Sequence, residues 1–246
     1  MGLGSSSQSA VDAFVELCES PVSTIAELDD LLKANLHVLN APSSSGKLAL
    51  VATLDAGNLD TVHWLLTDPY NNLRINNCGE DGCTALMSCC AAPAPLGAAA
   101  LTSILHTWGG SLKYAEQDEV NHWSALHYCA YHGATEQAAL LLAAEREHVS
   151  AALPGLASLL DHFGQSALHV AASRGHMGML RLLLEQCYSG SGGRSGELEV
   201  GVRGRDLEGF SAVDLADASE DGLTSVEEVR DLLLAHETRL SVTGEC

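Results

Sequence analysis

The chain has 246 residues, of which 46% are apolar and only 4% aromatic, and its formal net charge is −20. Its core must therefore consist of small aliphatic side chains, and its length allows one elongated domain or two compact ones. The 12 Lys and Arg residues are spread along the chain, which argues against nucleic acid as a partner and against an anionic membrane bound by charge alone.

No apolar run reaches the about 18–20 residues of a membrane span, and no secretory signal is recognisable at the start. The eight cysteines are too sparse for a disulfide scaffold and often fall in helical patterns, which is typical of a reducing compartment. We therefore expect a cytoplasmic protein without a transmembrane segment.

In chain order, residues 1–9 are expected to be a disordered N-terminus. Residues 10–43 contain VDAFVELC and IAELDDLLKANLHVL, in which apolar residues recur at helical spacing. These residues are predicted to form an N-terminal helical cap, and the APSSSG stretch at 41–46 is interpreted as a linker.

Four later segments share one template. They begin at CTALMSCCAA, WSALHYCAYHG, QSALHVAASRGH and FSAVDLADASEDG, and a weaker earlier copy is LALVATLDAGNLDTVHWLL at residues 48–66. A hydroxyl residue recurs at the same place in the four copies, Thr84, Ser124, Ser166 and Ser211. A recurring unit with variable insertions indicates a solenoid of stacked repeats.

The physical structure of one unit is readable in QSALHVAASRGHMGMLRLLL. Ser166 is predicted to cap a short helix with an apolar face, and Gly175 is predicted to end it in a left-handed conformation. Leu180 and Leu184 then recur at helical spacing and indicate a second helix. Two such short helices cannot close a core alone, so each hairpin must stack on its neighbours.

The pattern T/S-A-L-H-x-A-A-x-x-G-H resembles the ankyrin repeat. The resemblance implies an all-α ankyrin-repeat solenoid of helix-turn-helix units with short finger loops. Its five repeats would be residues 44–76, 77–115, 116–159, 160–202 with a Gly/Ser insertion at 188–196, and a C-terminal capping repeat at 203–238, followed by a tail at 239–246. The first, second and fifth repeats depart from the pattern.

The histidines and cysteines raise the alternative of a metal or thiol function. In proteins that resemble this one, His127 and His169 are structural, and His122, His127 and His132 cannot share one helix face at a spacing of five residues. Four cysteines lie between residues 78 and 90, namely Cys78, Cys83, Cys89 and Cys90. A thiol- or zinc-dependent protein built on them is the alternative function, although no CxxC pair is present. No sequence motif indicates an enzyme or a cofactor.

The resemblance places finger loops before each hydroxyl residue, reading GEDGCT, EVNHWS, DHFGQS and DLEGFS. It implies a non-catalytic protein-interaction module, acting as an adaptor, a scaffold or a subunit of a larger complex. We expect a basic or mixed-charge protein segment to bind along the fingers, although the acidity could equally serve solubility. The candidate partner-binding residues are Glu80, Asp81, Asp118, Glu119, Trp123, Phe163, Glu208 and Phe210.

Two points stay open at this stage. Large aromatic residues just before the hydroxyl, such as Trp123 and Phe210, could contact a partner or pack between adjacent hairpins. The start MGLGSSS fits an N-myristoylation motif with Gly2 as the acceptor, which would make the protein a weakly membrane-tethered adaptor. The sequence identifies neither the partner nor the oligomeric state.

Overall fold

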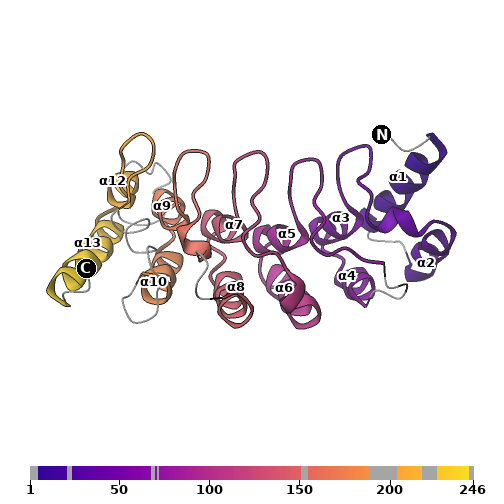
Figure 1. Ribbon diagram of the computed structural model, residues 1–246. Helices are drawn as coiled ribbons and strands as arrows, with labels where there is room; N and C mark the ends of the chain where they lie inside the picture. Colours follow the sequence, from indigo (N-terminus) through magenta and orange to yellow (C-terminus); the bar gives the residue numbers. More distant parts are fainter. Residues whose placement is uncertain are drawn as a thin grey trace. The chain divides into compact units, whose positions relative to one another are not determined.

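The computed structural model describes residues 5–20, 24–67, 70, 72–150, 155–188, 204–217 and 226–243. In these residues the regular secondary structure is helical, with two isolated β-bridges. The chain divides into two compact units, Met1–Lys113 with Asp118–Val120, and Tyr114–Gln117 with Asn121–Cys246. Each unit is built from helical hairpins joined by extended loops, as Figure 1 shows. The predicted all-α repeat fold is confirmed.

The first unit holds two N-terminal helices and two hairpins. Its helices are α1 (Ser5–Glu19), α2 (Ile25–Ala34), η1 (Leu36–Leu39), α3 (Ala49–Ala56), α4 (Leu59–Leu66), α5 (Ala85–Ala91), α6 (Leu96–Trp108) and η2 (Gly109–Ser111). Helix α1 packs on α3, and α3 packs on α5. Helix α1 begins at Ser5, so the expectation of disorder over residues 1–9 is wrong from residue 5 onward.

The second unit continues the same design. Its helices are α7 (Ala125–His132), α8 (Thr135–His148), η3 (Leu156–Ser158), α9 (Ala167–Ser173), α10 (Met177–Gln186), α12 (Ala212–Asp217) and α13 (Val226–Thr243). The inner helices α7, α9 and α12 pack on one another in that order. Their buried faces are rich in alanine, including Ala125, Ala130 and Ala171, each at most 1% exposed. Small side chains let neighbouring hairpins approach closely, so many short helices share one continuous core.

The predicted hairpin chemistry is confirmed. Thr84, Ser124 and Ser166 are the residues that precede α5, α7 and α9, and all three have extended backbones. Gly133 follows α7 at φ 65°, and Gly175 has φ 67°. Glycine adopts this left-handed conformation without the steric cost that a Cβ brings, so the chain turns sharply into the second helix of each hairpin.

The APSSSG stretch is a finger loop, and its interpretation as a linker is wrong. The backbone N–H of Ser43 donates to the carbonyl oxygen of Lys47 at 2.8 Å, and the N–H of Lys47 donates to the Ser43 hydroxyl at 3.2 Å. Asp161 makes the same two contacts with Gln165 in a later finger. The Ser43 hydroxyl thus accepts the hydrogen bond that an aspartate carboxylate accepts in the later finger. Because the residue type differs, the sequence pattern did not indicate this finger.

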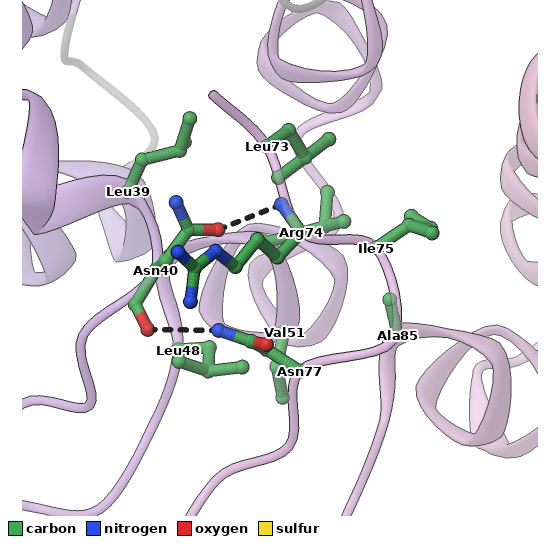
Figure 2. Close-up of a pocket in the computed structure, with 10 residues that line it drawn as sticks. Leu39, Asn40, Leu48, Val51, Leu73, Arg74, Ile75, Asn77 and Ala85 are labelled. Atoms are coloured by element: carbon green, nitrogen blue, oxygen red, sulfur yellow. Dashed lines mark hydrogen bonds between the residues drawn. The ribbon is translucent and has the colours of Figure 1, made fainter. Parts of the chain in front are cut away.

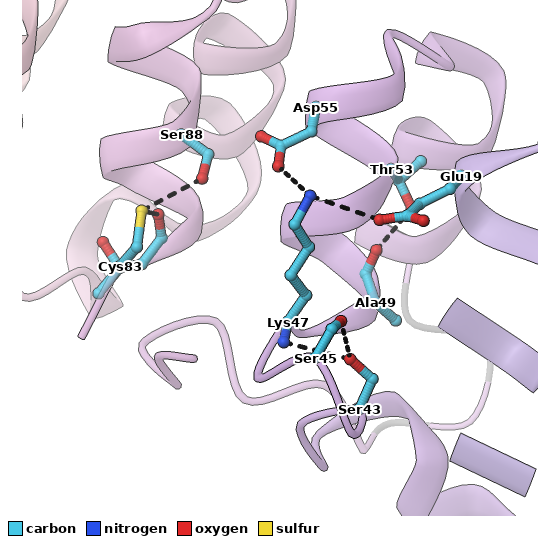
Figure 3. Close-up of polar contacts among 10 residues, drawn as sticks. Glu19, Ser43, Ser45, Lys47, Ala49, Thr53, Asp55, Cys83 and Ser88 are labelled. Carbon is cyan, nitrogen blue, oxygen red and sulfur yellow. Dashed lines mark hydrogen bonds and ion pairs between the residues drawn. The ribbon is translucent and has the colours of Figure 1, made fainter. Parts of the chain in front are cut away.

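Side chains hold this first finger to the helices of its unit. The Lys47 ammonium lies 3.0 Å from a carboxylate oxygen of Asp55 and 3.4 Å from one of Glu19, and both ion pairs are drawn in Figure 3. The hydrogen bond with Asp55 is the main cause of a raised pKa at Lys47. Because all three groups are partly exposed, the ion pairs position the finger more than they stabilise the fold.

A small pocket in the first unit lies where hydrogen bonds join separate segments of the chain. Asn40 accepts a hydrogen bond from the Arg74 backbone N–H at 2.7 Å and receives another from the Asn77 side chain at its carbonyl oxygen, 3.1 Å away (Figure 2). The apolar walls include Leu48 and Leu73. The interior volume of about 10 Å³ admits at most one water molecule, so the pocket is too small for a ligand.

Other predicted boundaries need adjustment or lie outside the described residues. Tyr188, placed at the start of the Gly/Ser insertion, is buried, and its hydroxyl donates to the carbonyl oxygen of Ala157 at 2.8 Å. The rest of that insertion, residues 189–196, lies outside the described residues. Helix α13 extends to Thr243, so most of the predicted tail at 239–246 is helical.

Candidate interaction surface

The finger loops of the second unit share one internal hydrogen-bond pattern. The carboxylate of Asp161 accepts from the backbone N–H groups of Phe163 and Gln165, both at 2.8 Å. Asp206 does the same with Glu208 at 3.0 Å and Phe210 at 2.8 Å. Each carboxylate therefore fixes the backbone beneath the fingertip residues, which are presented on a rigid loop.

Asp118 belongs to this structural class, so its assignment as a partner-binding residue is wrong. It is 1% exposed, and its carboxylate accepts from the backbone N–H of Val120 at 2.8 Å. Counted from Asp118, this finger reads DEVNHWS and has one residue more than DHFGQS or DLEGFS, which displaced the aspartate from its place in the sequence pattern. A side chain so buried cannot face a partner.

The other acidic candidates of the first unit are exposed. Glu80, Asp81 and Glu119 all lie at the surface. The backbone N–H of Glu80 donates to the carbonyl oxygen of Gly46 at 3.0 Å, and that of Glu119 donates to the carbonyl oxygen of Asp81 at 2.9 Å. Successive fingers are thus hydrogen-bonded to each other through their backbones, and the three acidic residues lie on neighbouring fingers.

The tips of the second unit carry large exposed apolar side chains. Phe163 is 59% exposed and Phe210 is 45% exposed. Leu207, which the sequence analysis missed, is 79% exposed and is joined to the previous finger by its N–H, which donates to the Phe163 carbonyl oxygen at 2.9 Å. Its place directly after Asp206 was the signal that could have identified it. Large apolar side chains this exposed mark a surface that can bind.

Trp123 is half-buried and contacts its own hairpin. Its ring centroid lies 5.4 Å from that of Tyr128 and 5.0 Å from that of Tyr131, and its indole N–H donates to the Asp161 carboxylate at 3.2 Å. The guanidinium of Arg174 lies 4.5 Å from the centroid of the Tyr131 ring. Trp123 therefore packs between adjacent fingers, and a partner can reach only its outer part. No feature of the sequence pattern indicated the roles of Tyr131 and Arg174.

The histidines of the repeat motif are structural. His169 is fully buried, and its Nε2 lies 3.2 Å from the carbonyl oxygen of Gly204. Because a carbonyl only accepts, Nε2 carries the hydrogen, and Nδ1 accepts from the backbone N–H of Ser166 at 3.3 Å. His127 repeats this geometry toward Gln165. Burial is the main cause of a lowered pKa at His169, and both nitrogens are occupied by protein groups.

The remaining histidines of the predicted series do not converge. His122 has a φ of 57° and lies in a finger, where its ring stacks on that of His162 with the centroids 4.0 Å apart. His132 lies at the end of α7, and burial is the main cause of its lowered pKa. Across the part of the chain that the structure describes, no group of three or more His, Cys, Asp or Glu side chains is placed to hold a metal ion.

The cysteines between residues 78 and 90 are divided between surface and core. Cys78 is exposed, whereas Cys89 and Cys90 are fully buried. Burial raises the pKa of Cys83 to about 11 and that of Cys89 well above its usual value. The Cys83 sulfur lies 3.5 Å from the Ser88 hydroxyl (Figure 3). Raised pKa values leave little thiolate at neutral pH, which disfavours nucleophilic chemistry.

Gly2, the residue of the lipidation motif, lies outside the described residues. Within them, no helix combines the length and the apolar character that crossing a membrane would require.

These features define tandem helical hairpins, most of which begin at a Ser or Thr cap. Buried His127 and His169 each link one hairpin to the next repeat, and hydrogen-bonded fingers lie at the tips. Residues 97–191 match the family model of ankyrin repeats, in three copies. This segment therefore contains ankyrin repeats, as its sequence suggested. A search of curated proteins found no match.

The fold is also similar to that of a solved structure. A chain from the complex of the Bd0816 predatory endopeptidase of Bdellovibrio bacteriovorus with immunity protein Bd3460 aligns with a TM-score of 0.64. The alignment covers 91% of this chain and 97% of that one, at 18% sequence identity. At this identity the similarity establishes the fold alone.

Proposed function

We propose that this protein is a non-catalytic protein-interaction module that binds a basic or mixed-charge segment of another protein on its fingertips. The ankyrin repeats at residues 97–191 support interaction as the general role. The observation that carries the proposal is the exposure of Phe163, Leu207 and Phe210 on loops whose backbones are fixed by buried carboxylates. Rigid apolar side chains lose little conformational freedom when a partner covers them.

The acidic tips of the first unit give the proposal its charge preference. Glu80, Asp81 and Glu119 are exposed, and the chain as a whole has a net charge of −20. A field of this sign accelerates the encounter with a basic segment, and added salt screens it. We propose a cytoplasmic adaptor, scaffold or complex subunit, since the thiols of Cys18 and Cys89 are buried in the core and suit a reducing compartment.

Affinity purification of the tagged protein from its native cell, followed by mass spectrometry, tests this function. The test variants are the charge reversal Glu80→Lys/Asp81→Lys/Glu119→Lys and the apolar-tip variant Phe163→Ser/Phe210→Ser. Each is expected to lose partners that the unaltered protein retains, with the loss from charge reversal being smaller at high salt.

The matched control reverses three exposed charges on helices, with Glu16→Lys, Glu136→Lys and Glu147→Lys. It changes the net charge by the same amount as the fingertip reversal and should retain the partners. If the fingertip variants and the control capture the same proteins at the same yield, the fingertips are not the binding surface and the proposal fails.

A further inference from the structure

Three fingers have a glycine that the next finger covers, and in the finger at residues 118–124 His122, with φ 57°, takes the place of the glycine. Gly46, Gly82 and Gly164 all have φ between +75° and +81°. A Cβ added to them would lie 3.0 Å from Glu80, 2.6 Å from Glu119 and 3.1 Å from Leu207, respectively. These neighbours are the second residues of the following fingers. We call the space above such a glycine the finger seat.

The seat above Gly209, in the finger that ends at Phe210, is open. Gly209 has φ +89°, and a Cβ added there would meet no atom of the described residues within 4 Å. Glu208 is the third residue of its finger, as Phe163 is of the finger before. The Phe163 carbonyl oxygen accepts a hydrogen bond from the N–H of Leu207 in the next finger, and the Glu208 carbonyl holds the corresponding position. An acceptor and a seat for one more segment are thus in place.

The opposite end of the finger series is closed by the chain itself. Ser44 is the second residue of its finger, and its backbone N–H donates to the carboxylate of Asp12 in α1 at 2.6 Å. This hydrogen bond is the main cause of the lowered pKa of Asp12. Since the first donor is occupied, a second copy of this chain cannot offer it to the open seat.

The side chain of Phe210 also distinguishes the finger with the open seat from the fingers before it. In the two preceding fingers the corresponding residues reach forward, because Trp123 donates to the Asp161 carboxylate at 3.2 Å and Gln165 donates to that of Asp206 at 3.0 Å. Phe210 is 45% exposed and has no polar group for such a contact. Its ring is suited to an apolar side chain of an incoming segment.

A complete additional repeat does not fit this end equally well. In the last repeat, Asp214 occupies the position that His169 has one repeat earlier. Its carboxylate accepts from the Ser211 N–H at 2.9 Å and from the Ser211 hydroxyl at 2.7 Å, whereas His169 donates to the next repeat. An ionised carboxylate cannot donate onward to a carbonyl. The hydrogen bond by which a buried histidine joins one repeat to the next is therefore absent at Asp214, whereas the seat above Gly209 is still available to a single segment.

We propose that the open seat above Gly209 binds a turn or extended segment of another protein, which donates a backbone N–H to Glu208 and packs an apolar side chain against Leu207 and Phe210. The proposal deepens the proposed function and rests on it. The Arg205 guanidinium donates to the carbonyl oxygen of Gly209 at 2.6 Å and lies 3.5 Å from the Asp214 carboxylate. Residues 205–217 still contain four acidic side chains against this one basic residue, and Glu208 is exposed at the seat, so the segment should carry basic residues beside its apolar one.

The test titrates the full-length 15N-labelled protein with a disulfide-cyclised peptide, Cys-Arg-Asp-Leu-Lys-Gly-Gln-Cys, which mimics a finger with a basic tip. Saturable shifts of the Gly209 and Phe210 amide signals are expected. Phe210→Ser, a change at an exposed position, should weaken binding by about tenfold or more. The matched control Leu234→Ser removes a similarly exposed apolar side chain on α13, 40% exposed and away from the fingers, and should change the affinity by less than about twofold.

Four results would overturn the proposal. The first is an absence of saturable shifts at the last finger, and the second is equal weakening by the two Ser substitutions. The third is self-association of the chain that Phe210→Ser abolishes, which would make a second copy the occupant. The fourth is peptide binding only after deletion of residues 189–196, which would make the chain's own insertion the occupant. A failed titration beside intact partner capture would refute the seat and leave the proposed function standing.

Discussion

Replacing His169 with leucine should strongly destabilise the second unit. The imidazole is fully buried, and three protein groups bond to it: the N–H of Ser166 at 3.3 Å, the hydroxyl of Ser166 at 2.9 Å and the carbonyl of Gly204 at 3.2 Å. Leucine fills a similar volume but leaves these groups buried without that partner. Each such group costs about 1–3 kcal/mol, so we expect a loss of about 3–5 kcal/mol in the free energy of unfolding.

A second substitution separates the capping contacts from the link between repeats. His169→Asn can still accept from Ser166, as Asp214 does from Ser211, but it is too short to reach Gly204. It should therefore lose only about 1–2 kcal/mol. Urea unfolding followed by far-ultraviolet circular dichroism measures both losses, and His162→Leu at an exposed fingertip is the control, expected within about 0.5 kcal/mol of the unaltered protein. A cost for His169→Leu no greater than that of the control would refute the structural role.

The remaining predictions concern pH, thiols and turns. Burial lowers the pKa of His169, so as the pH falls the unfolded chain is protonated at this residue before the folded protein is. The contribution of the neutral His169 to stability should therefore be complete above about pH 6.5 and decline below it. In urea titrations over this range, His169→Asn should show a shallower decline of stability with falling pH. Cys78 is exposed whereas the pKa of Cys83 is about 11, so mass mapping after brief alkylation at pH 8 should find Cys78 modified at least about tenfold faster, and equal rates would contradict the assigned burial. Gly133→Ala should cost about 1–3 kcal/mol in thermal unfolding, because φ is 65° and the new Cβ would lie 2.9 Å from the His176 ring; an unchanged melting temperature would show that this turn is not constrained.

Sequence reasoning succeeded where one residue type alone meets a physical requirement. A hydroxyl at Ser124 or Ser166 caps a helix, and a glycine at 133 or 175 permits the left-handed turn that follows. Both requirements are local, so they are visible in a short stretch of sequence. The stacking of hairpins followed because short helices cannot bury their apolar faces alone.

The failures came from substitutions that keep the geometry and change the residue. Ser43 makes the finger contacts that aspartate makes elsewhere, and the longer third finger displaced Asp118 from its expected place. Burial at long range was also hidden, because the contact between Tyr188 and Ala157 joins residues 31 positions apart. The exposure of Leu207 depends on where the fingers end, which a pattern within one repeat cannot indicate.

The central claim, that the fingertips contact a protein partner, is tested most directly by site-specific photo-crosslinking in the native cell. A benzophenone amino acid is placed at Phe163 or Phe210, both exposed fingertip positions, and at Glu147 on α8 as the control. The account predicts adducts with the same protein from the two fingertip positions and none with it from position 147. Adducts from position 147 alone, or no adduct from either fingertip, would contradict it.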